Sequence, residues 1–153
     1  MTEFFFYHLE RQSLEETLPV LLLKCQDRQW RSMVRRSSKE GVAALSELLW
    51  RFGENSFLAH ACVDDEKMQA YAADQPIWIT SNNDCPNGAH VLFLLDGTEV
   101  EDISAYTRVV YLFDGRNEES LEKSRSFWKT LKQKDVALSY WQQSAQGGWE
   151  QKA

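Results

Sequence analysis

Short, continuously apolar segments alternate along this chain with segments whose apolar residues recur at helical spacing, and this alternation constrains the fold most strongly. Strands buried on both faces are continuously apolar, and a parallel sheet places a helix between successive strands. The expected strands are residues 4–9, 33–36, 77–80, 91–95, 109–113 and 137–141, of which the second and the last carry weaker signals. We therefore predict an α/β fold with three layers, α/β/α, and a mostly parallel central sheet of about five strands.

Three helices are expected between these strands. Ser13 and Glu16 have the spacing of a capping box at the start of the first helix. The second helix opens at Ser38, and the third covers residues 118–134 with acids first and bases last, as the helix dipole favours. Residues 53–75 are the least regular part of the chain and are expected to form a loop with a short helical piece.

The composition predicts one domain spanning residues 1–153, with a real core because 43% of the residues are apolar. The formal net charge is −6, which makes the chain a poor candidate for wrapping DNA, since phosphate contacts need clustered Lys and Arg. A local basic patch stays open, so the distribution of charge matters more than its sum.

The cysteines and the N-terminus predict a cytoplasmic protein. Cys25, Cys62 and Cys85 are odd in number and widely spaced, so neither a disulfide scaffold nor a zinc site is expected. The start of the chain lacks the basic residues and long apolar stretch of a signal peptide, and no apolar run approaches the roughly 20 residues of a membrane span.

No phosphate-binding fingerprint of the form GxGxxG or GxxxxGK[ST] is present. Asp96-Gly97 and Asp114-Gly115 follow strands at the edge where α/β proteins bind ligands, although Asp and Gly also make good turns, which is the reading that we favour.

Other residues with catalytic or metal-binding chemistry are also expected to be structural. The histidines are far apart in sequence, and the acidic run suits a solvated loop; they are His8, His60 and His90, and Asp64, Asp65 and Glu66. We therefore predict no catalytic residues, no metal site and no cofactor.

The last predicted helix carries a basic cluster in an otherwise acidic chain. Arg125 and Trp128 are three residues apart and share a face, and Lys129 and Lys132 continue the same stripe. With Lys123, this arrangement suits an acidic peptide that has an apolar end. The alternative from the pattern alone is a core tryptophan beside a solvated basic face.

A second aromatic cluster, Trp50, Phe52 and Phe57, lies at the end of the second helix and in the segment after it. Aromatic residues in such a place either plug the core or form a protein-binding patch, and spacing does not separate the two.

Four blocks of sequence follow one another along the chain. They are Phe4 to Leu9; Leu48-Leu49-Trp50 with residues 55–60; Asn87-Gly88-Ala89 with residues 91–97; and Leu112 to Gly115 with Arg125, Phe127-Trp128-Lys129 and Tyr140-Trp141. In this order and spacing the chain resembles the chi subunit family of bacterial DNA polymerase III. The resemblance implies an α/β/α fold, no catalytic activity and a role as a clamp-loader accessory protein.

The resemblance also implies a first partner, the acidic C-terminal tail of single-stranded-DNA-binding protein, which ends in an apolar residue with a free carboxylate. The family binds this tail on the last long helix, through an arginine and an aromatic residue one turn apart with nearby lysines. These roles fall on Arg125 and Trp128, with Lys129 alongside. A family lysine one turn before the arginine is Leu121 here, and Lys123 is the residue that could substitute for it.

A second implied partner is the psi subunit or a helicase-like repair protein, which the family binds through an aromatic pair matching Trp50 and Phe57. We therefore predict a non-catalytic replication adaptor. The alternatives are a small nucleotide- or metal-dependent enzyme that uses Asp96 and Asp114, and a weak binder of single-stranded DNA through the basic helix and Trp128.

Overall fold

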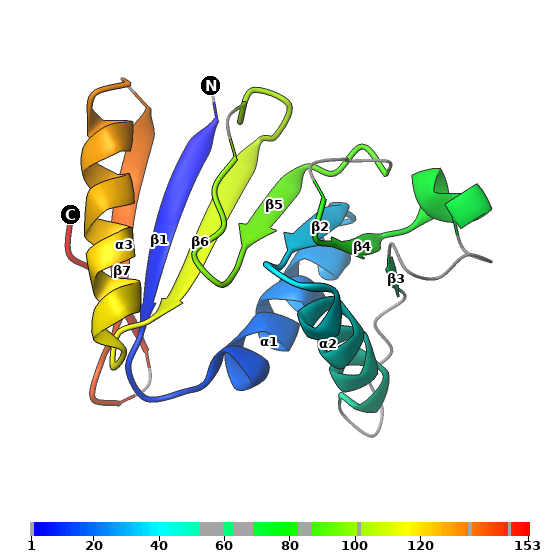
Figure 1. Ribbon diagram of the computed structural model, residues 1–153, viewed down its shortest axis with the longest axis horizontal. Coiled ribbons are helices and arrows are strands. Elements are labelled where there is room, and N and C mark those ends of the chain that lie inside the picture. The colour runs from blue at the N-terminus through cyan, green and yellow to red at the C-terminus, as the bar shows by residue number, and fades with distance from the viewer. Residues whose placement is uncertain are drawn as a thin grey trace.

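A mixed β-sheet with helices on both faces forms the centre of the molecule (Figure 1). The computed structural model describes residues 2–52, 60–62, 69–82, 87–100, 102–134, 136–146 and 148–153. Within these residues the sheet has eight strands in the order β3-β4-β2-β5-β6-β1-β7-β8. The strands are β1 (Glu3–Leu9), β2 (Ser32–Arg35), β3 (Ala61–Cys62), β4 (Ile77–Thr80), β5 (Val91–Leu94), β6 (Arg108–Asp114), β7 (Ala137–Gln143) and β8 (Trp149–Gln151). The helices are α1 (Leu14–Asp27), α2 (Lys39–Arg51), the 3-10 helix η1 (Gln69–Asp74) and α3 (Glu118–Lys132).

The predicted α/β class and mostly parallel sheet are confirmed, because every ladder is parallel except the one between β7 and β8. The predicted number of about five strands is wrong, since the described residues form eight. β3 and β8 have only two and three residues, which is too short for an apolar pattern to reveal. The short helical piece expected within residues 53–75 is η1.

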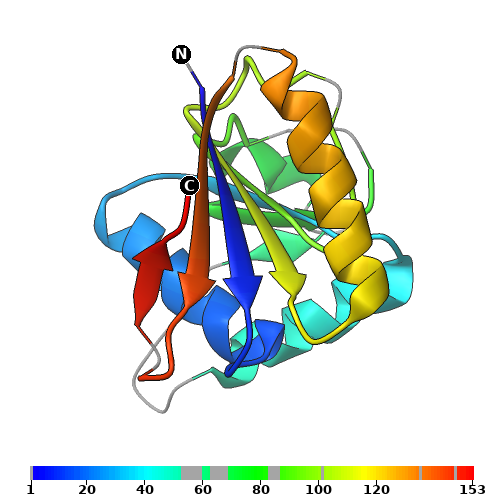
Figure 2. The ribbon, with the colours of Figure 1, turned by 90° about the vertical axis from the view of Figure 1, so that its left-hand side faces the viewer.

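β1 lies between β6 and β7, and its alternate side chains enter two different cores. Phe4 and Phe6 are fully buried on the face that α3 covers, where the Phe4 ring meets Phe127 edge to face at 5.4 Å. Tyr7 and Leu9 point to the opposite face, toward α1. Figure 2 shows α1 and α3 on opposite sides of the sheet, which confirms the three-layer arrangement.

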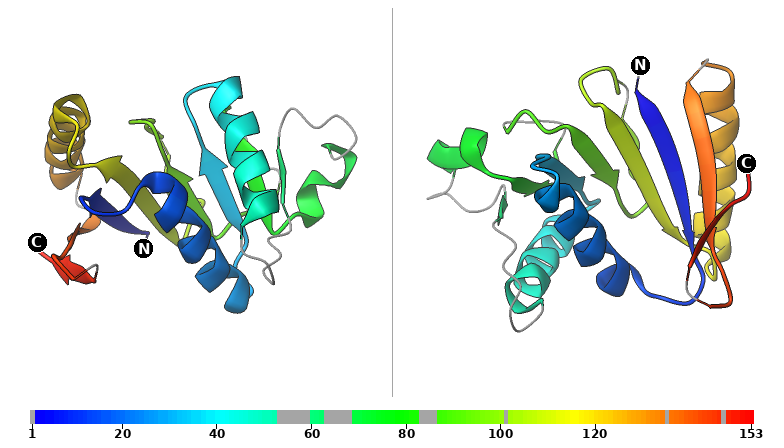
Figure 3. Two further views of the ribbon diagram at one scale, coloured as in Figure 1. Left: turned by 90° about the horizontal axis from the view of Figure 1, so that it is seen from below. Right: turned by 180° about the vertical axis from the view of Figure 1, so that it is seen from behind.

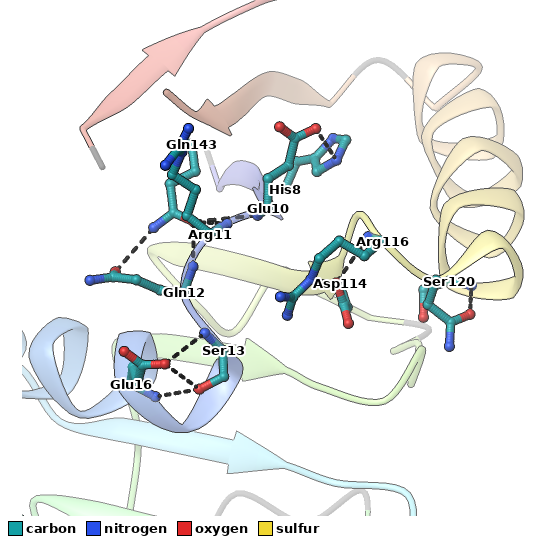
Figure 4. A network of polar contacts seen from close by, with 11 residues as sticks. His8, Glu10, Arg11, Gln12, Ser13, Glu16, Asp114, Arg116, Ser120 and Gln143 are labelled. Carbon is teal, nitrogen blue, oxygen red and sulfur yellow. Dashed lines mark hydrogen bonds and ion pairs between the residues drawn. The ribbon is translucent and has the colours of Figure 1, made fainter. Parts of the chain in front are cut away.

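The first two helices begin where the sequence places their caps. Ser13 and Glu16 form a capping box at the start of α1 (Figure 4). At the start of α2, the Ser38 hydroxyl accepts a hydrogen bond from the Gly41 backbone N–H at 3.0 Å. Leucines and a valine of both helices are buried in one core with β5 and β6: Leu18, Leu22, Val42, Leu45 and Leu49. In the part of the chain that the structure describes, no helix has the length and apolar character needed to span a bilayer.

Gln143 ties the end of β7 to the loop between β1 and α1. Its side-chain oxygen accepts hydrogen bonds from the backbone N–H groups of Glu10, Arg11 and Gln12 at 3.3, 2.9 and 3.0 Å (Figure 4). This residue is buried, so the three loop donors are satisfied away from water and the path into α1 is fixed.

Two of the three cysteines lie in described residues, and both are free thiols. Burial raises the pKa of the Cys25 thiol, which keeps it protonated and inert. Cys62 is partly buried, and Cys85 lies outside the described residues.

Gly115, directly after β6, is required by the close approach of two strand ends. Its backbone N–H donates to the Leu9 carbonyl at 2.7 Å, and a Cβ at this position would overlap the His8 imidazole and lie 2.9 Å from the Leu9 oxygen. We expect Gly115→Ala to lower the free energy of unfolding by more than about 2 kcal/mol, measured by urea denaturation. Gly148→Ala is the matched control, because its Cβ would meet only the Ser144 hydroxyl at 3.6 Å. Equal midpoints for the two variants would show that the strand ends can separate at little cost.

Candidate functional site

α3 packs one stripe of fully buried side chains against the sheet, and most of its other residues are exposed. Ser124, Phe127 and Leu131 form the buried stripe. Acidic residues occupy the first turn of the helix, and Lys129 and Lys132 the last, an arrangement that the helix dipole stabilises. The functional candidates therefore lie beside the buried stripe and not within it.

Trp128 stands at the border between core and solvent. It is partly buried, and its ring meets Phe6 at 5.2 Å and Tyr140 at 5.8 Å, both edge to face. The Lys132 ammonium lies 5.5 Å from the centre of the same ring, within the range of a cation–π contact. The Trp128 indole is thus an apolar surface held in place by two aromatic rings, with the Lys132 ammonium over its ring.

Arg125 lies one turn before Trp128 and is exposed. None of the described carboxylates lies within 4.0 Å of its guanidinium, so its charge is available to a partner. Burial raises the pKa of Tyr140 and lowers that of His8, and the positive charge of Arg125 lowers both. Because Arg125 and Trp128 are three residues apart on α3, their side chains lie on the same flank of the helix.

Polar contacts among residues of β1, β7 and the loop after β1 support the flank of α3 that carries Arg125 and Trp128. The Tyr140 hydroxyl and His8 Nδ1 are hydrogen-bonded at 2.7 Å, and His8 Nε2 lies 3.2 Å from the Glu10 carboxylate, an ion-pair distance without hydrogen-bond geometry. Gln142 donates to the same carboxylate at 2.8 Å. Figure 4 shows His8 and Glu10 facing each other. The sequence predicts only a structural role for His8 and no separate role for Tyr140, because their pairing across neighbouring strands leaves no local pattern.

The structure brings together four of the five residues predicted on this helix: Arg125, Trp128, Lys129 and Lys132, which with Tyr140 we name the α3 site. Lys123 lies on the opposite flank of the helix. Its ammonium is 3.7 Å from Glu119, and its side chain passes so close to Gly97 that a Cβ there would be 3.1 Å from Lys123 Cδ. The structure therefore separates Lys123 from the α3 site.

The second predicted cluster lies at the end of α2. This helix packs near β3 and β4, at the other end of the sheet from β1 and β7, which lie beneath the α3 site. Trp50 is 58% exposed, and its ring centre is 4.4 Å from that of His60. Phe52 is partly buried against the core beneath α1 and α2. Phe57 lies outside the described residues, so the predicted pairing of Phe57 with Trp50 stays a prediction.

The remaining histidines have structural partners. His60 Nε2 is 3.1 Å from the Ser46 hydroxyl, and His90 Nδ1 accepts a hydrogen bond from the Arg31 backbone N–H at 3.1 Å. The predicted acidic loop of Asp64, Asp65 and Glu66 lies outside the described residues. Among the residues that are described, no group of three or more His, Cys, Asp or Glu is arranged to hold a metal ion.

The two strand-end carboxylates line a crevice of about 460 Å³ between the start of α1 and the start of α3, and both are already paired. Asp96 accepts two hydrogen bonds from the Arg36 guanidinium, each 2.9 Å long, and a third from the Ser37 backbone N–H at 3.1 Å. Asp114 accepts from the backbone and side chain of Arg116 at 2.9 and 3.1 Å (Figure 4). Asp96 also has a φ of 59° within its turn. Both residues thus hold turns and strand ends.

Residues 1–139 match the family model described as DNA polymerase III chi subunit, HolC. A curated relative from Rickettsia prowazekii (strain Madrid E), named "Probable DNA polymerase III subunit chi", is 25% identical over 121 residues, which make up 74% of this chain and 71% of that protein.

The Arg36–Asp96 pair predicts a pH-dependent contribution to stability. Burial acts to raise the pKa of Asp96, but the hydrogen bonds from Arg36 and Ser37 outweigh it and the net shift is downward. The stabilisation is therefore complete above the ordinary aspartate pKa of about 3.9 and is lost as the pH falls through the lower pKa of the folded state. At pH 7 we expect Asp96→Asn to cost about 1.5 kcal/mol of unfolding free energy.

Urea denaturation of both proteins between pH 7 and pH 3 checks this expectation, because the difference should shrink in the acidic range. Glu47→Gln is the control: its ion pair with Arg51 is exposed at 3.6 Å and should contribute less than about 0.5 kcal/mol. If the difference in unfolding free energy between Asp96→Asn and the parent protein stayed the same at pH 3, the effect of the substitution would come from side-chain geometry and not from the carboxylate charge.

Proposed function

This chain belongs to the DNA polymerase III chi subunit family, and we propose that it links the clamp loader of the polymerase to the acidic C-terminal tail of single-stranded-DNA-binding protein. The family is an accessory subunit of a replicative polymerase and not a catalytic enzyme. The protein is thus a replication accessory protein, and in the proposed role it acts in the cytoplasm at the replication fork.

The observation that carries the proposal is the pairing of Arg125 with Trp128 on one flank of α3. Arg125 is exposed and has no carboxylate within 4.0 Å among the described residues, so it can meet the terminal carboxylate of a peptide with two parallel hydrogen bonds. The Trp128 ring, held by Phe6 and Tyr140, supplies an apolar surface one turn away for the terminal side chain. A peptide that ends in an apolar residue with a free carboxylate satisfies both groups at once.

The lysines of the α3 site suit the acidic residues that precede the end of such a tail. Lys129 and Lys132 are exposed on the same flank as Arg125, and their charges act through water at longer range. Lys123 lies on the other flank, against Gly97, and its contribution in this proposal is the smallest of the three.

For the second partner we propose the psi subunit or a helicase-like repair protein, docking at Trp50. An exposed tryptophan at a helix end is a common anchor in protein interfaces, and Trp50 is one of the few large apolar side chains of the described residues with more than half its surface in water. Phe52, two residues further along, is partly buried against the core, and Phe57 is expected to complete the aromatic pair.

Titration of a fluorescent acidic tail peptide against variants of the α3 site tests the first partner. Arg125→Ala should weaken binding by about 2–4 kcal/mol, because it removes a charge-assisted contact at the centre of the site. Trp128→Ala should have a comparable effect. Each of Lys129→Ala and Lys132→Ala should cost only about 0.5 kcal/mol, and less as the salt concentration rises.

The matched control is Arg51→Ala, which removes the same charge from an exposed arginine on α2. It should bind the tail peptide like the parent protein. If Arg125→Ala also binds like the parent protein, the basic flank of α3 is only a solvated surface and the proposed mechanism is lost.

A further inference from the structure

The face of the sheet opposite α3 carries a strip of aromatic side chains on its last strands. The ladder register sets Tyr7 of β1 level with Trp141 of β7, so both point to this face, and the Trp149 ring of β8 lies 4.8 Å from the Tyr7 ring. Phe5 stacks on Tyr7 with ring planes only 11° apart. Seen from behind, α3 lies beyond the sheet and no helix of the described chain lies in front of β1 and β7 (Figure 3, right).

Positive charges border this strip. The Arg108 guanidinium lies 4.9 Å from the Phe5 ring centre and 5.1 Å from that of Trp30, and Arg28 stands 5.1 Å from the same Trp30 ring. Lys24 is exposed one turn before Arg28 on α1. Within the described residues no carboxylate lies within 4.0 Å of any of these three cations, and the buried Nε of Arg108 has no hydrogen-bond partner.

The strip and the cations meet in a groove of about 230 Å³ between α1 and the last strands, which we name the aromatic groove. Its walls come from Tyr7, Trp30, Trp141 and Trp149, and Lys24, Arg28 and Arg108 line it as well. Pockets for whole small molecules are usually larger, about 300–1,000 Å³, so this groove suits one planar ring of a longer ligand.

We infer that the aromatic groove binds single-stranded nucleic acid, with a base stacked on its indole rings and the flanking phosphates at Lys24 and Arg28. Base stacking on aromatic side chains combined with cations that follow the backbone is the general mode of binding for unpaired strands. Bases in a duplex are already stacked on one another, so a duplex could offer only its phosphates. The site is separate from the α3 site and lies on the opposite face of the sheet.

The cations Lys24, Arg28 and Arg108 in the groove favour an unpaired nucleic-acid strand over an apolar protein surface. A second copy of this chain would bring a net charge of −6 toward the groove but no planar anionic group shaped for it, whereas an unpaired strand supplies rings and phosphates in alternation. Because the chain itself is acidic, binding should be weak and should fall steeply with salt.

The test is fluorescence anisotropy of a labelled oligo(dT) strand titrated with the full chain at low salt. Lys24→Glu/Arg28→Glu reverses two exposed charges at the groove, and Lys39→Glu/Arg51→Glu reverses two exposed charges on α2. Each double variant lowers the net charge by 4, from −6 to −10. Comparing the two therefore separates the effect of charge at the groove from the effect of overall charge. We expect the first to weaken binding by about tenfold or more and the second by about twofold or less.

Three further measurements complete the experiment. The salt dependence of log K should become shallower by about 1.4 in the groove variant, since each phosphate contact to a single strand contributes about 0.7. An abasic strand of the same length, and a duplex, should bind several-fold more weakly than oligo(dT), because neither offers a free base to stack. Binding of the acidic tail peptide should be unchanged in the groove variant and lost in Arg125→Ala, whereas oligo(dT) binding should survive Arg125→Ala.

Equal weakening by the two charge-reversed variants would overturn the inference, as would equal affinity for the abasic strand or no binding by the parent protein. A concentration-dependent dimer in sedimentation, abolished in Lys24→Glu/Arg28→Glu, would also overturn it and assign the groove to a second copy. Because tail binding is read separately, failure of the groove leaves the proposed adaptor function standing, and the reverse also holds.

Discussion

The parallel pairing of β1 with β6 on one side and β7 on the other is the interaction on which the rest of the structure depends. Because side chains alternate along a strand, β1 sends Phe4 and Phe6 into the core under α3, and Tyr7 and Leu9 toward α1. A shift of one residue in this register would exchange the two sets, so that each helix would meet side chains of a different shape from those it packs against here. Gly115 and Gln143 fix the ends of the same three strands, so the register is supported by backbone contacts as well as by apolar packing.

This arrangement gives neighbouring residues access to opposite faces of the protein. On β7, Tyr140 packs against Trp128 in the α3 site, whereas the next residue, Trp141, lines the aromatic groove. On β1, His8 supports the α3 site and Tyr7 lines the groove in the same way. One layer of sheet thus separates the two surfaces, so an occupant of one does not collide with an occupant of the other. Trp50 lies on α2, which packs toward the β3–β4 end of the sheet, and is separate from both.

The fold class could be predicted from sequence because buried parallel strands are continuously apolar and the helices between them begin with recognisable caps at Ser13 and Ser38. β8 could not, since its three residues are placed by pairing with β7 and by the contact of Trp149 with Tyr7. On α3, helical spacing alone puts Arg125, Trp128 and Lys132 on one flank. Lys123 belongs to the same basic cluster in the sequence, but its spacing from Arg125 places it on the other flank. Tyr140 and Arg108 join their sites through tertiary contacts, which one-dimensional periodicity does not encode.

Both proposed ligands are polyanions, whereas the chain carries a net charge of −6. An acidic protein can still bind a polyanion, because salt limits the distance over which its other charges repel the ligand. At physiological ionic strength, exposed charges more than about 8 Å apart are largely screened, so a ligand responds to the cations it touches. Several acids near the candidate sites are also engaged by the protein itself, as Asp96 is by Arg36, Asp114 by Arg116, and Glu10 by Gln142. A narrow strand or a peptide tail can follow a short row of free cations and avoid the acidic surface around it. A duplex has a broader footprint and would bring more of its phosphates over those acids, so the acidic surface itself favours unpaired strands and tails.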